Sequence, residues 1–278
     1  LPSARGKGGR VYLDYWGLKV PPFENLPNPD FLYFSPKHEE AMTRLLYAAH
    51  GRKGAAMLSG DVGMGKTTLT RAFVRQLSED KFDIGIIANP SLSPVDFIKE
   101  ILYQLNVEEN TDSKVDLLRL LNNKTLNNAQ AGKTTIVIVD EAQAIRDDAT
   151  MEELRLLLNF QLNDRFLITL ILVGQPELRE RVEKIPQLSQ RISIKYHLSP
   201  LDYAETVKFI FFRLKVAGLE KSIFSEQAIK MVHQASTGVP RRIVNLCDLC
   251  LLVGFSYKVP LINSKLVEKV VRDGGGGI

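Results

Sequence analysis

The sequence predicts an α/β fold with a parallel sheet, followed by a small all-helical domain. Helical stretches alternate with five apolar runs that are predicted strands, at Ala55–Ser59, Phe82–Ala88, Thr134–Asp140, Phe166–Gly174 and Ile192–His197. Such alternation favours a parallel sheet that helices cover on both faces. After the last strand only helices are predicted, at residues 202–217, 225–236, 240–254 and 263–272.

From these patterns we expect two domains with short flexible ends. The α/β domain is assigned to residues 11–198 and the helical domain to residues 199–273. Residues 1–10 are basic and glycine-rich, which predicts a flexible tail, and the glycine run in residues 274–278 predicts a flexible end. The first residue is Leu1 rather than methionine, so we expect a fragment or a processed product.

The first predicted strand leads into a phosphate-binding motif. Residues 60–67 read GDVGMGKT and match G-x-x-x-x-G-K-[ST] at every fixed position. Glycines leave successive backbone N–H groups able to hold phosphate oxygens, Lys66 supplies a positive charge, and the Thr67 hydroxyl suits Mg²⁺. Chance occurrence is disfavoured, because the motif sits where a strand, a loop and a helix are expected. By contrast, Gly132-Lys133-Thr134 repeats only the last three letters, has no glycine five residues before Gly132 and precedes a strand, so it is not a second motif. The residues expected to bind the nucleotide here are Gly60, Asp61, Val62, Gly63, Met64, Gly65, Lys66, Thr67 and Thr68.

Helix boundaries in the first domain follow from capping residues and apolar spacing. Ser93 is an expected N-cap, with Pro94 in the first turn, for a helix that continues to about Leu105. Apolar spacing also predicts helices over Lys114–Asn128 and Thr150–Leu162.

Composition limits the classes of function. With 45% hydrophobic and 24% charged residues the chain is an ordinary globular protein, and a net charge of +4 is too small to argue for nucleic-acid binding. Cys247 and Cys250 form a single C-x-x-C pair in an apolar helical pattern, which favours core cysteines over a zinc or redox site and suits a reducing compartment. No apolar run reaches the ~18 residues of a membrane-spanning helix, and no signal peptide is predicted.

An acid pair ends the third predicted strand. Ile136–Val139 is a continuous apolar run of the kind that buried parallel strands have, and Asp140 and Glu141 follow it. We expect Asp140 to lie beside the phosphate loop and to hold Mg²⁺ through water, and Glu141 to orient or deprotonate the attacking water. The alternative is a strand that ends in solvated acids without a chemical role.

A polar residue after the next strand is a further candidate. Gln175 follows the run Leu167–Gly174, and we expect it to lie within reach of the attacking water. Thr169, deeper in the same apolar run, is the weaker choice. The alternative for Gln175 is an ordinary solvated loop glutamine.

Arginines are candidates for stabilising charge on the transferred phosphoryl group, because a guanidinium pairs with two oxygens at once. Arg179 and Arg181 follow Gln175 in the sequence. Arg191 precedes the last strand, from which we expect it to reach the nucleotide of a neighbouring subunit. The alternative for Arg191 is a surface arginine without such a role.

One arginine of the helical domain is also a candidate. Arg241 follows Gly238-Val239-Pro240 at the start of a predicted helix, and we expect it to fold onto the γ-phosphate. Arg242 is the ordinary surface residue by comparison.

In their order and spacing these features resemble the AAA+ ATPases. The likeness covers residues 11–272 and includes the phosphate loop, the acid pair, a polar residue after the fourth strand, an arginine before the fifth and Gly-x-Pro-Arg in a helical lid. It implies a P-loop AAA+ fold with sheet order 5-1-4-3-2, ATP and Mg²⁺ as cofactors, ATP hydrolysis, and a homo-oligomer, either a hexamer-like ring or a filament, with sites between subunits. It implies metal ligation by Thr67 and Asp140, and catalytic roles for Lys66, Glu141, Gln175, Arg191 and Arg241.

A narrower likeness is to the general secretion pathway protein A group of ATPases. It rests on Tyr15–Leu18 with Pro22-Phe23, and on Asn28–Tyr33, Glu152–Leu157 and Val173–Leu178. It implies a cytoplasmic ATPase that acts as a motor or switch in bacterial secretion or envelope assembly, at the inner face of the inner membrane in longer forms that continue into a membrane span and a periplasmic region. It also implies that Leu32, Tyr33 and His38 contact adenine, with core packing of an aromatic-rich arm as the alternative.

Two other functions stay open. Transposition ATPases of the MuB and TnsC kind share the AAA+ core and form filaments on DNA, and the basic residues Arg5, Lys7 and Arg10 would suit such a regulator, although no helix-turn-helix is predicted. The other is a nucleotide sensor that binds ATP without hydrolysing it. A Ras-type GTPase is disfavoured, because Asn123–Leu126 lacks the aspartate of the guanine-reading N-K-x-D pattern.

Overall fold

The structure, a computed structural model, describes residues 7–26 and 28–275. The described chain forms two compact units. One is an α/β unit made of residues 36–62 and 66–198, and the other is a helical unit made of residues up to 35, residues 63–65 and residues from 199 onward.

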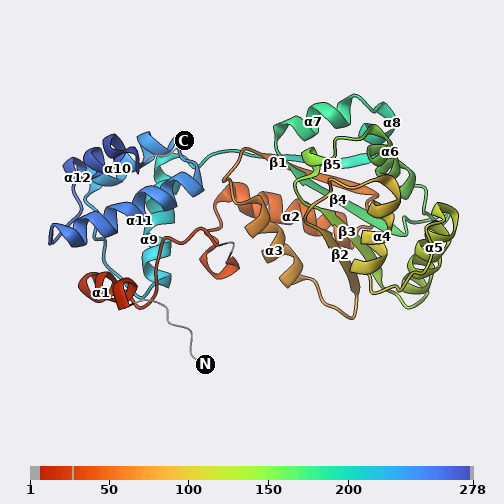
Figure 1. The fold of residues 1–278 in the computed structure, drawn as a ribbon, viewed down its shortest axis with the longest axis horizontal. Helices are drawn as coiled ribbons and strands as arrows, with labels where there is room; N and C mark the ends of the chain where they lie inside the picture. Colours follow the sequence, from red (N-terminus) through yellow and green to blue (C-terminus); the bar gives the residue numbers. More distant parts are fainter. Residues whose placement is uncertain (1–6, 27, 276–278) are drawn as a thin grey trace. The chain divides into compact units, whose positions relative to one another are not determined.

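The α/β unit contains a parallel five-stranded sheet (Figure 1). Its strands are β1 (Ala55–Gly60), β2 (Phe82–Ile87), β3 (Thr134–Val139), β4 (Ile168–Gly174) and β5 (Ile192–Leu198), in the order β2-β3-β4-β1-β5. The predicted order 5-1-4-3-2 is therefore confirmed. β1, β3 and β4 are buried along their whole length, whereas the edge strands β2 and β5 are partly exposed.

Helices cover both faces of this sheet. α2 (Pro36–His50) and α3 (Lys66–Gln76) pack against each other and against the central strands. On the other face lie α4 (Pro94–Gln104), α5 (Lys114–Gln130), α6 (Asp148–Leu157), α7 (Pro176–Glu183) and α8 (Pro186–Arg191). A short 3₁₀ turn, η2 (Ala142–Ala144), precedes α6.

Local capping explains where several of these helices begin and end. The Ser93 side chain accepts the Asp96 N–H at the start of α4, as predicted, and Ser113 caps α5 in the same way. Two predicted boundaries are wrong: the end of the predicted helix Thr150–Leu162 and the start of the predicted strand at Phe166. α6 ends at Leu157, and residues 158–167 form a short hairpin with an antiparallel bridge between Gln161 and Phe166, so β4 begins only at Ile168.

The helical unit is built around four helices after the sheet: α9 (Tyr203–Val216), α10 (Glu226–Ser236), α11 (Pro240–Ser256) and α12 (Ser264–Val270). A π-helical turn, η3 (Val271–Gly275), follows α12. The unit also contains α1 (Lys7–Trp16) and the 3₁₀ turn η1 (Pro29–Phe31). Cys247 and Cys250 are free thiols in its core, and burial raises the pKa of both, that of Cys250 to about 12, which makes them unreactive.

The N-terminal segment differs from its predicted placement. We assigned residues 11–35 to the α/β domain, but they group with the helical unit, because their anchors lie there. The indole N–H of Trp16 donates to the Leu251 carbonyl at 3.0 Å, and the buried Arg213 guanidinium donates to the carbonyls of Pro22 at 2.7 Å and Glu24 at 3.0 Å. Burial lowers the pKa of Arg213 to about 10, so the group stays charged and holds this segment at neutral pH.

The predicted flexible ends also differ from the structure where it describes them. α1 already begins at Lys7, so residues 7–10 are helical. η3 extends to Gly275, but Gly274 within it has a non-helical backbone with φ of +87°. The remainder of both predictions, residues 1–6 and 276–278, lies outside the described residues. Within residues 7–26 and 28–275, no helix combines the length and the apolar character needed to cross a membrane.

Candidate nucleotide-binding site

The phosphate loop connects β1 to α3 at the carboxyl edge of the sheet. Gly63 and Gly65 have φ values of +86° and +90°, in the left-handed region that a side chain disfavours, so the loop needs glycine at these points. Lys66 is the first residue of α3 and is only 5% exposed. Its Nζ donates to the carbonyls of Gly60 at 2.7 Å and Asp61 at 3.0 Å. The loop therefore folds around the lysine ammonium, as a phosphate-binding motif requires.

An acidic side chain from β3 meets the hydroxyl that follows the lysine. Thr67 Oγ1 donates to Asp140 Oδ2 at 2.9 Å, and Asp140 Oδ1 accepts the Glu141 N–H at 2.9 Å. The meeting follows from the sheet, since parallel strands end at one edge and β4 alone separates β1 from β3. Burial raises the pKa of Asp140, against the opposing effect of these hydrogen bonds.

The pair Thr67 and Asp140 fits Mg²⁺. Both offer oxygen, the donor that this ion prefers, and a bound cation would offset the burial of the Asp140 charge. Among the described residues, no cluster of three or more His, Cys, Asp or Glu could cage a metal by itself. Phosphate oxygens and water would therefore complete the coordination, which is common for Mg²⁺ at nucleotides.

Glu141 and Gln175 are joined through a residue that the sequence analysis missed. Gln143 Nε2 donates to Glu141 Oε2, and Gln143 Oε1 accepts the backbone N–H of Gln175 at 3.0 Å. The Gln175 side chain lies farther from Glu141, with Nε2 at 3.5 Å from Oε2. The structure thus brings Glu141 and Gln175 together, and Gln143 bridges them.

The backbone supports this bridge at two points. Glu141 has a left-handed backbone with φ of +50°, uncommon for a non-glycine residue, and the η2 turn that follows carries Gln143 back toward it. Gly174 leaves room for the glutamine, because a Cβ there would lie 2.7 Å from Gln143 Oε1. The only sequence signal for Gln143 was its place two residues after Glu141.

Thr169 does not lie at this edge. It pairs with Ile136 near the start of β4 and is fully buried, and its hydroxyl has no hydrogen-bond partner among the described residues. The structure therefore does not bring it to the acid pair.

Arg191 lies at the opposite, amino edge of the sheet. It ends α8 directly before β5, a strand of seven residues whose last residue, Leu198, pairs with Gly60. A strand of that length spans about 20 Å, so Arg191 is far from the phosphate loop of its own copy. Its Nη1 donates to Asn159 Oδ1 at 2.7 Å.

The other basic candidates have contacts of their own. Arg179 pairs with Glu183 at 2.8 Å, one turn further along the same helix, α7. Arg181 donates to the carbonyls of Ile145 and Arg146, so it ties α7 to the segment after η2. In the helical unit, which includes Gly63–Gly65, the Arg241 N–H donates to the Gly63 carbonyl at 3.1 Å, while its side chain is exposed.

The three residues expected to contact adenine are divided between the two units. Leu32 and Tyr33 belong to the helical unit, where the Tyr33 ring packs against Phe209 and Phe212 at centroid distances of 6.2 and 5.9 Å. His38 is buried on α2 of the α/β unit.

Comparison with known proteins identifies the family. An AAA domain family model matches residues 49–182. General secretion pathway protein A of Aeromonas hydrophila is 38% identical over 249 residues, which cover 88% of this chain and 45% of that protein. The chain belongs to the AAA+ proteins and is related to general secretion pathway protein A. The AAA+ domain described here thus spans less than half the length of that relative.

Solved structures share the fold of this AAA+ domain. The ORC2 protein of Aeropyrum pernix, in ADPNP-ADP complexes, matches with a TM-score of 0.67 and 20% identity over 91% of this chain and 71% of that chain. The RuvB Holliday junction branch migration motor of Thermotoga maritima matches with a TM-score of 0.59 and 20% identity over 86% of this chain and 71% of that chain. At this identity the two likenesses support the fold alone. The predicted fold class and the predicted family are both confirmed.

Proposed function

We propose that this AAA+ domain binds ATP with Mg²⁺ and hydrolyses it to ADP and phosphate. The proposal rests on three sets of polar residues that lie together at the carboxyl edge of the sheet. They are the phosphate loop with Lys66, the pair Thr67 and Asp140, and the hydrogen-bonded set Glu141, Gln143 and Gln175. A phosphate loop alone binds a nucleotide. The adjoining carboxylate and amides add groups suited to positioning water against it.

Each residue has a distinct role in this proposal. Lys66 and the backbone of residues 60–68 hold the phosphates, and Thr67 and Asp140 hold Mg²⁺, which supplies charge neutralisation on the phosphate oxygens when bound. Glu141 accepts a proton from the attacking water, and Gln175 orients that water or the γ-phosphate. Gln143 keeps the Glu141 carboxylate in place by donating to it.

A second copy is needed to complete the site. Because Arg191 lies about 20 Å along the sheet from the phosphate loop of its own copy, its guanidinium is better placed to serve the nucleotide of a neighbour. We therefore propose a homo-oligomer, as a ring or a filament, with Arg191 supplied between copies. By resemblance to the family, Arg241 senses the γ-phosphate, and Leu32, Tyr33 and His38 contact adenine.

The similarity to general secretion pathway protein A extends the proposal to bacterial secretion or envelope assembly. In this role the ATP cycle drives a motor or switch, on the cytoplasmic side of the inner membrane. The test is secretion of a reporter protein by cells whose own copy carries Lys66→Ala. Undiminished secretion would reject this role and leave the ATPase proposal intact.

Steady-state phosphate release tests the hydrolysis itself. Glu141→Gln should keep ATP binding and lower turnover at least about 100-fold, and it should stabilise the oligomer when ATP is added. Lys66→Ala should lose both binding and turnover, whereas the matched exposed variant Glu79→Gln should keep both. Turnover of the unmodified protein no greater than that of Lys66→Ala would identify a nucleotide sensor instead, and full turnover in Glu141→Gln would reject the role of that carboxylate.

A further inference from the structure

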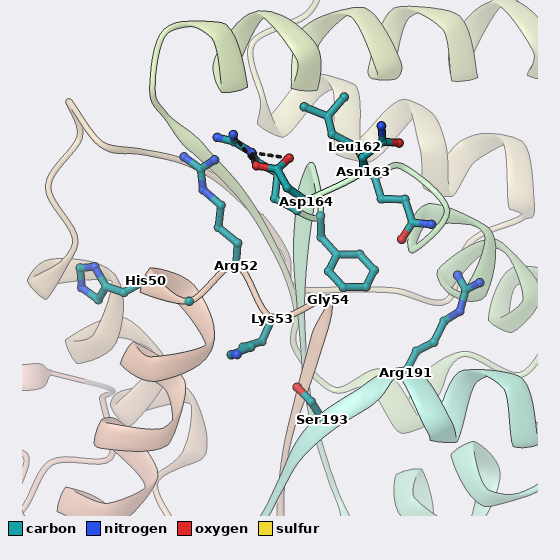
Figure 2. Close-up of a pocket in the computed structure, with 13 residues that line it drawn as sticks. His50, Arg52, Lys53, Gly54, Leu162, Asn163, Asp164, Arg191 and Ser193 are labelled. Carbon is teal, nitrogen blue, oxygen red and sulfur yellow. Dashed lines mark hydrogen bonds and ion pairs between the residues drawn. The ribbon is translucent and has the colours of Figure 1, made fainter.

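The α/β unit has a cavity at the amino edge of its sheet, on the side of Arg191. Its volume is about 630 Å³. The walls come from residues 50–54 at the end of α2 and after it, and from residues 161–166 of the hairpin. Arg191 at the end of α8 and Ser193 in β5 complete them (Figure 2). Four cationic side chains line it against a single carboxylate, that of Asp164: they belong to Arg52, Lys53, Arg165 and Arg191. The cavity therefore favours an anionic group.

The arginines of this cavity differ in their partners. Arg165 forms an ion pair with Asp164 at 2.6 Å, and Arg52 donates to Thr134 Oγ1 at 3.0 Å and to the Gly132 carbonyl at 3.3 Å. Arg191 instead donates to the neutral amide oxygen of Asn159. Within the described chain, no ion pair links Arg191 to a carboxylate.

Backbone hydrogen bonds fix the position of Asn159, the residue that accepts from the Arg191 guanidinium. It follows the last turn of α6, and its N–H donates to the Leu156 carbonyl at 2.9 Å. The next residue, Phe160, is fixed from both sides, since its N–H donates to Leu157 and its carbonyl accepts the Leu167 N–H at 2.8 Å. The amide of Asn159 thus projects from the start of the hairpin, where the backbone is hydrogen-bonded both to α6 and to the other side of the hairpin.

A neutral amide suits a guanidinium that must act on a phosphate. A carboxylate at this position would form an ion pair and compete with the phosphate oxygens for the same N–H groups. The amide oxygen accepts one of the five N–H groups of Arg191 and fixes its direction without cancelling the charge.

We infer that Asn159 is a positioning residue for Arg191, holding its guanidinium in the cavity so that it can meet the phosphates of ATP bound to a second copy of this chain. The inference rests on the proposed function, because it requires Arg191 to act between copies.

Mixing two defective variants tests the inference. Arg191→Ala keeps the phosphate loop but lacks the guanidinium, and Lys66→Ala keeps the guanidinium but cannot use ATP. Mixed oligomers should regain phosphate release, because Lys66→Ala chains donate Arg191 to the sites of Arg191→Ala chains. A donor that also carries Asn159→Asp should restore about tenfold less turnover, the factor expected when Arg191 must give up a charge-assisted bond to a carboxylate.

Two control donors change a neighbouring residue of the cavity or keep the amide of Asn159. Asn163 is exposed on the hairpin and lines the cavity, and a donor with Lys66→Ala and Asn163→Asp should restore turnover fully, because it adds the same charge without touching the Arg191 bond. A donor with Asn159→Gln, which keeps an amide oxygen, should restore more than Asn159→Asp. The donors carry no working phosphate loop, so a change in their own nucleotide binding cannot imitate the effect, and their unfolding midpoints report on folding.

The outcomes separate the inference from the proposed function. Full restoration by the Asn159→Asp donor would overturn the positioning role and leave the action of Arg191 between copies intact. Failure of the plain Lys66→Ala donor to restore any turnover would reject that action itself, and the inference with it.

Discussion

Replacing Gln143 with alanine tests whether the Glu141 carboxylate must be held in place for hydrolysis. The change removes the donor to Glu141 Oε2 and the acceptor of the Gln175 N–H. A hydrogen bond to a charged group contributes about 1.5–3 kcal/mol, which corresponds to a ten- to hundredfold fall in turnover if the bond is fully needed in the transition state. Gln175 is only partly buried, so its N–H would turn to water, and the loss of folding stability should stay near 1 kcal/mol.

The assay pairs steady-state phosphate release with equilibrium binding of a fluorescent ATP analogue. The affinity for ATP should change less than about twofold, because Gln143 bonds to Glu141 and Gln175 and not to the phosphate loop. Gln130→Ala, at the exposed end of α5, is the matched control. A turnover equal to that of the control, or an affinity that falls in step with turnover, would refute the reasoning.

Three further outcomes are expected. Asp140→Asn should abolish Mg²⁺-dependent turnover yet raise the unfolding midpoint. Because burial raises the pKa of Asp140, the free-energy cost of its charge grows as the pH rises above the ordinary pKa of an aspartate. A gain in the unfolding midpoint at pH 7 that is no larger than the gain near pH 4 would contradict this account. Thr169→Val should stabilise the protein by about 1 kcal/mol, measured by thermal unfolding, because its buried hydroxyl lacks a partner in the described chain, whereas Thr135→Val should destabilise it by losing the bond from Asn128. In a gel shift at physiological salt, the net charge of +4 predicts no tight ATP-dependent DNA binding, and a clear shift would favour the DNA-associated regulator.

The sheet was predictable because its strands carry their own signal. β3 and β4 are buried on both faces and are therefore continuous apolar runs, which place the acid pair and Gln175 directly at the strand ends. The order of the strands came from the resemblance to a family and not from the residues alone. Once that order is known, Thr67 must face Asp140, and the structure places them 2.9 Å apart.

The placement of the N-terminal segment was not predictable from local pattern. Residues 11–35 precede the first strand, so sequence order favoured the α/β domain. Their actual anchors, the bond from Trp16 to Leu251 and those from Arg213 to Pro22 and Glu24, join residues about 190 to 235 positions apart. Neither apolar periodicity nor a capping motif reports on contacts at that separation.

The two amides that sequence reasoning missed lie just before and just after α6, and both hold a charged group. Gln143 donates to the Glu141 carboxylate, and Asn159 accepts from the Arg191 guanidinium. An amide carries both a donor and an acceptor, so it can orient either sign of charge without neutralising it. Because each bond depends on a short turn, η2 in one case and the bend after α6 in the other, only the folded backbone distinguishes these amides from ordinary surface residues. Charged motifs in this AAA+ domain could therefore be recognised from the sequence, whereas the neutral groups that aim them could not.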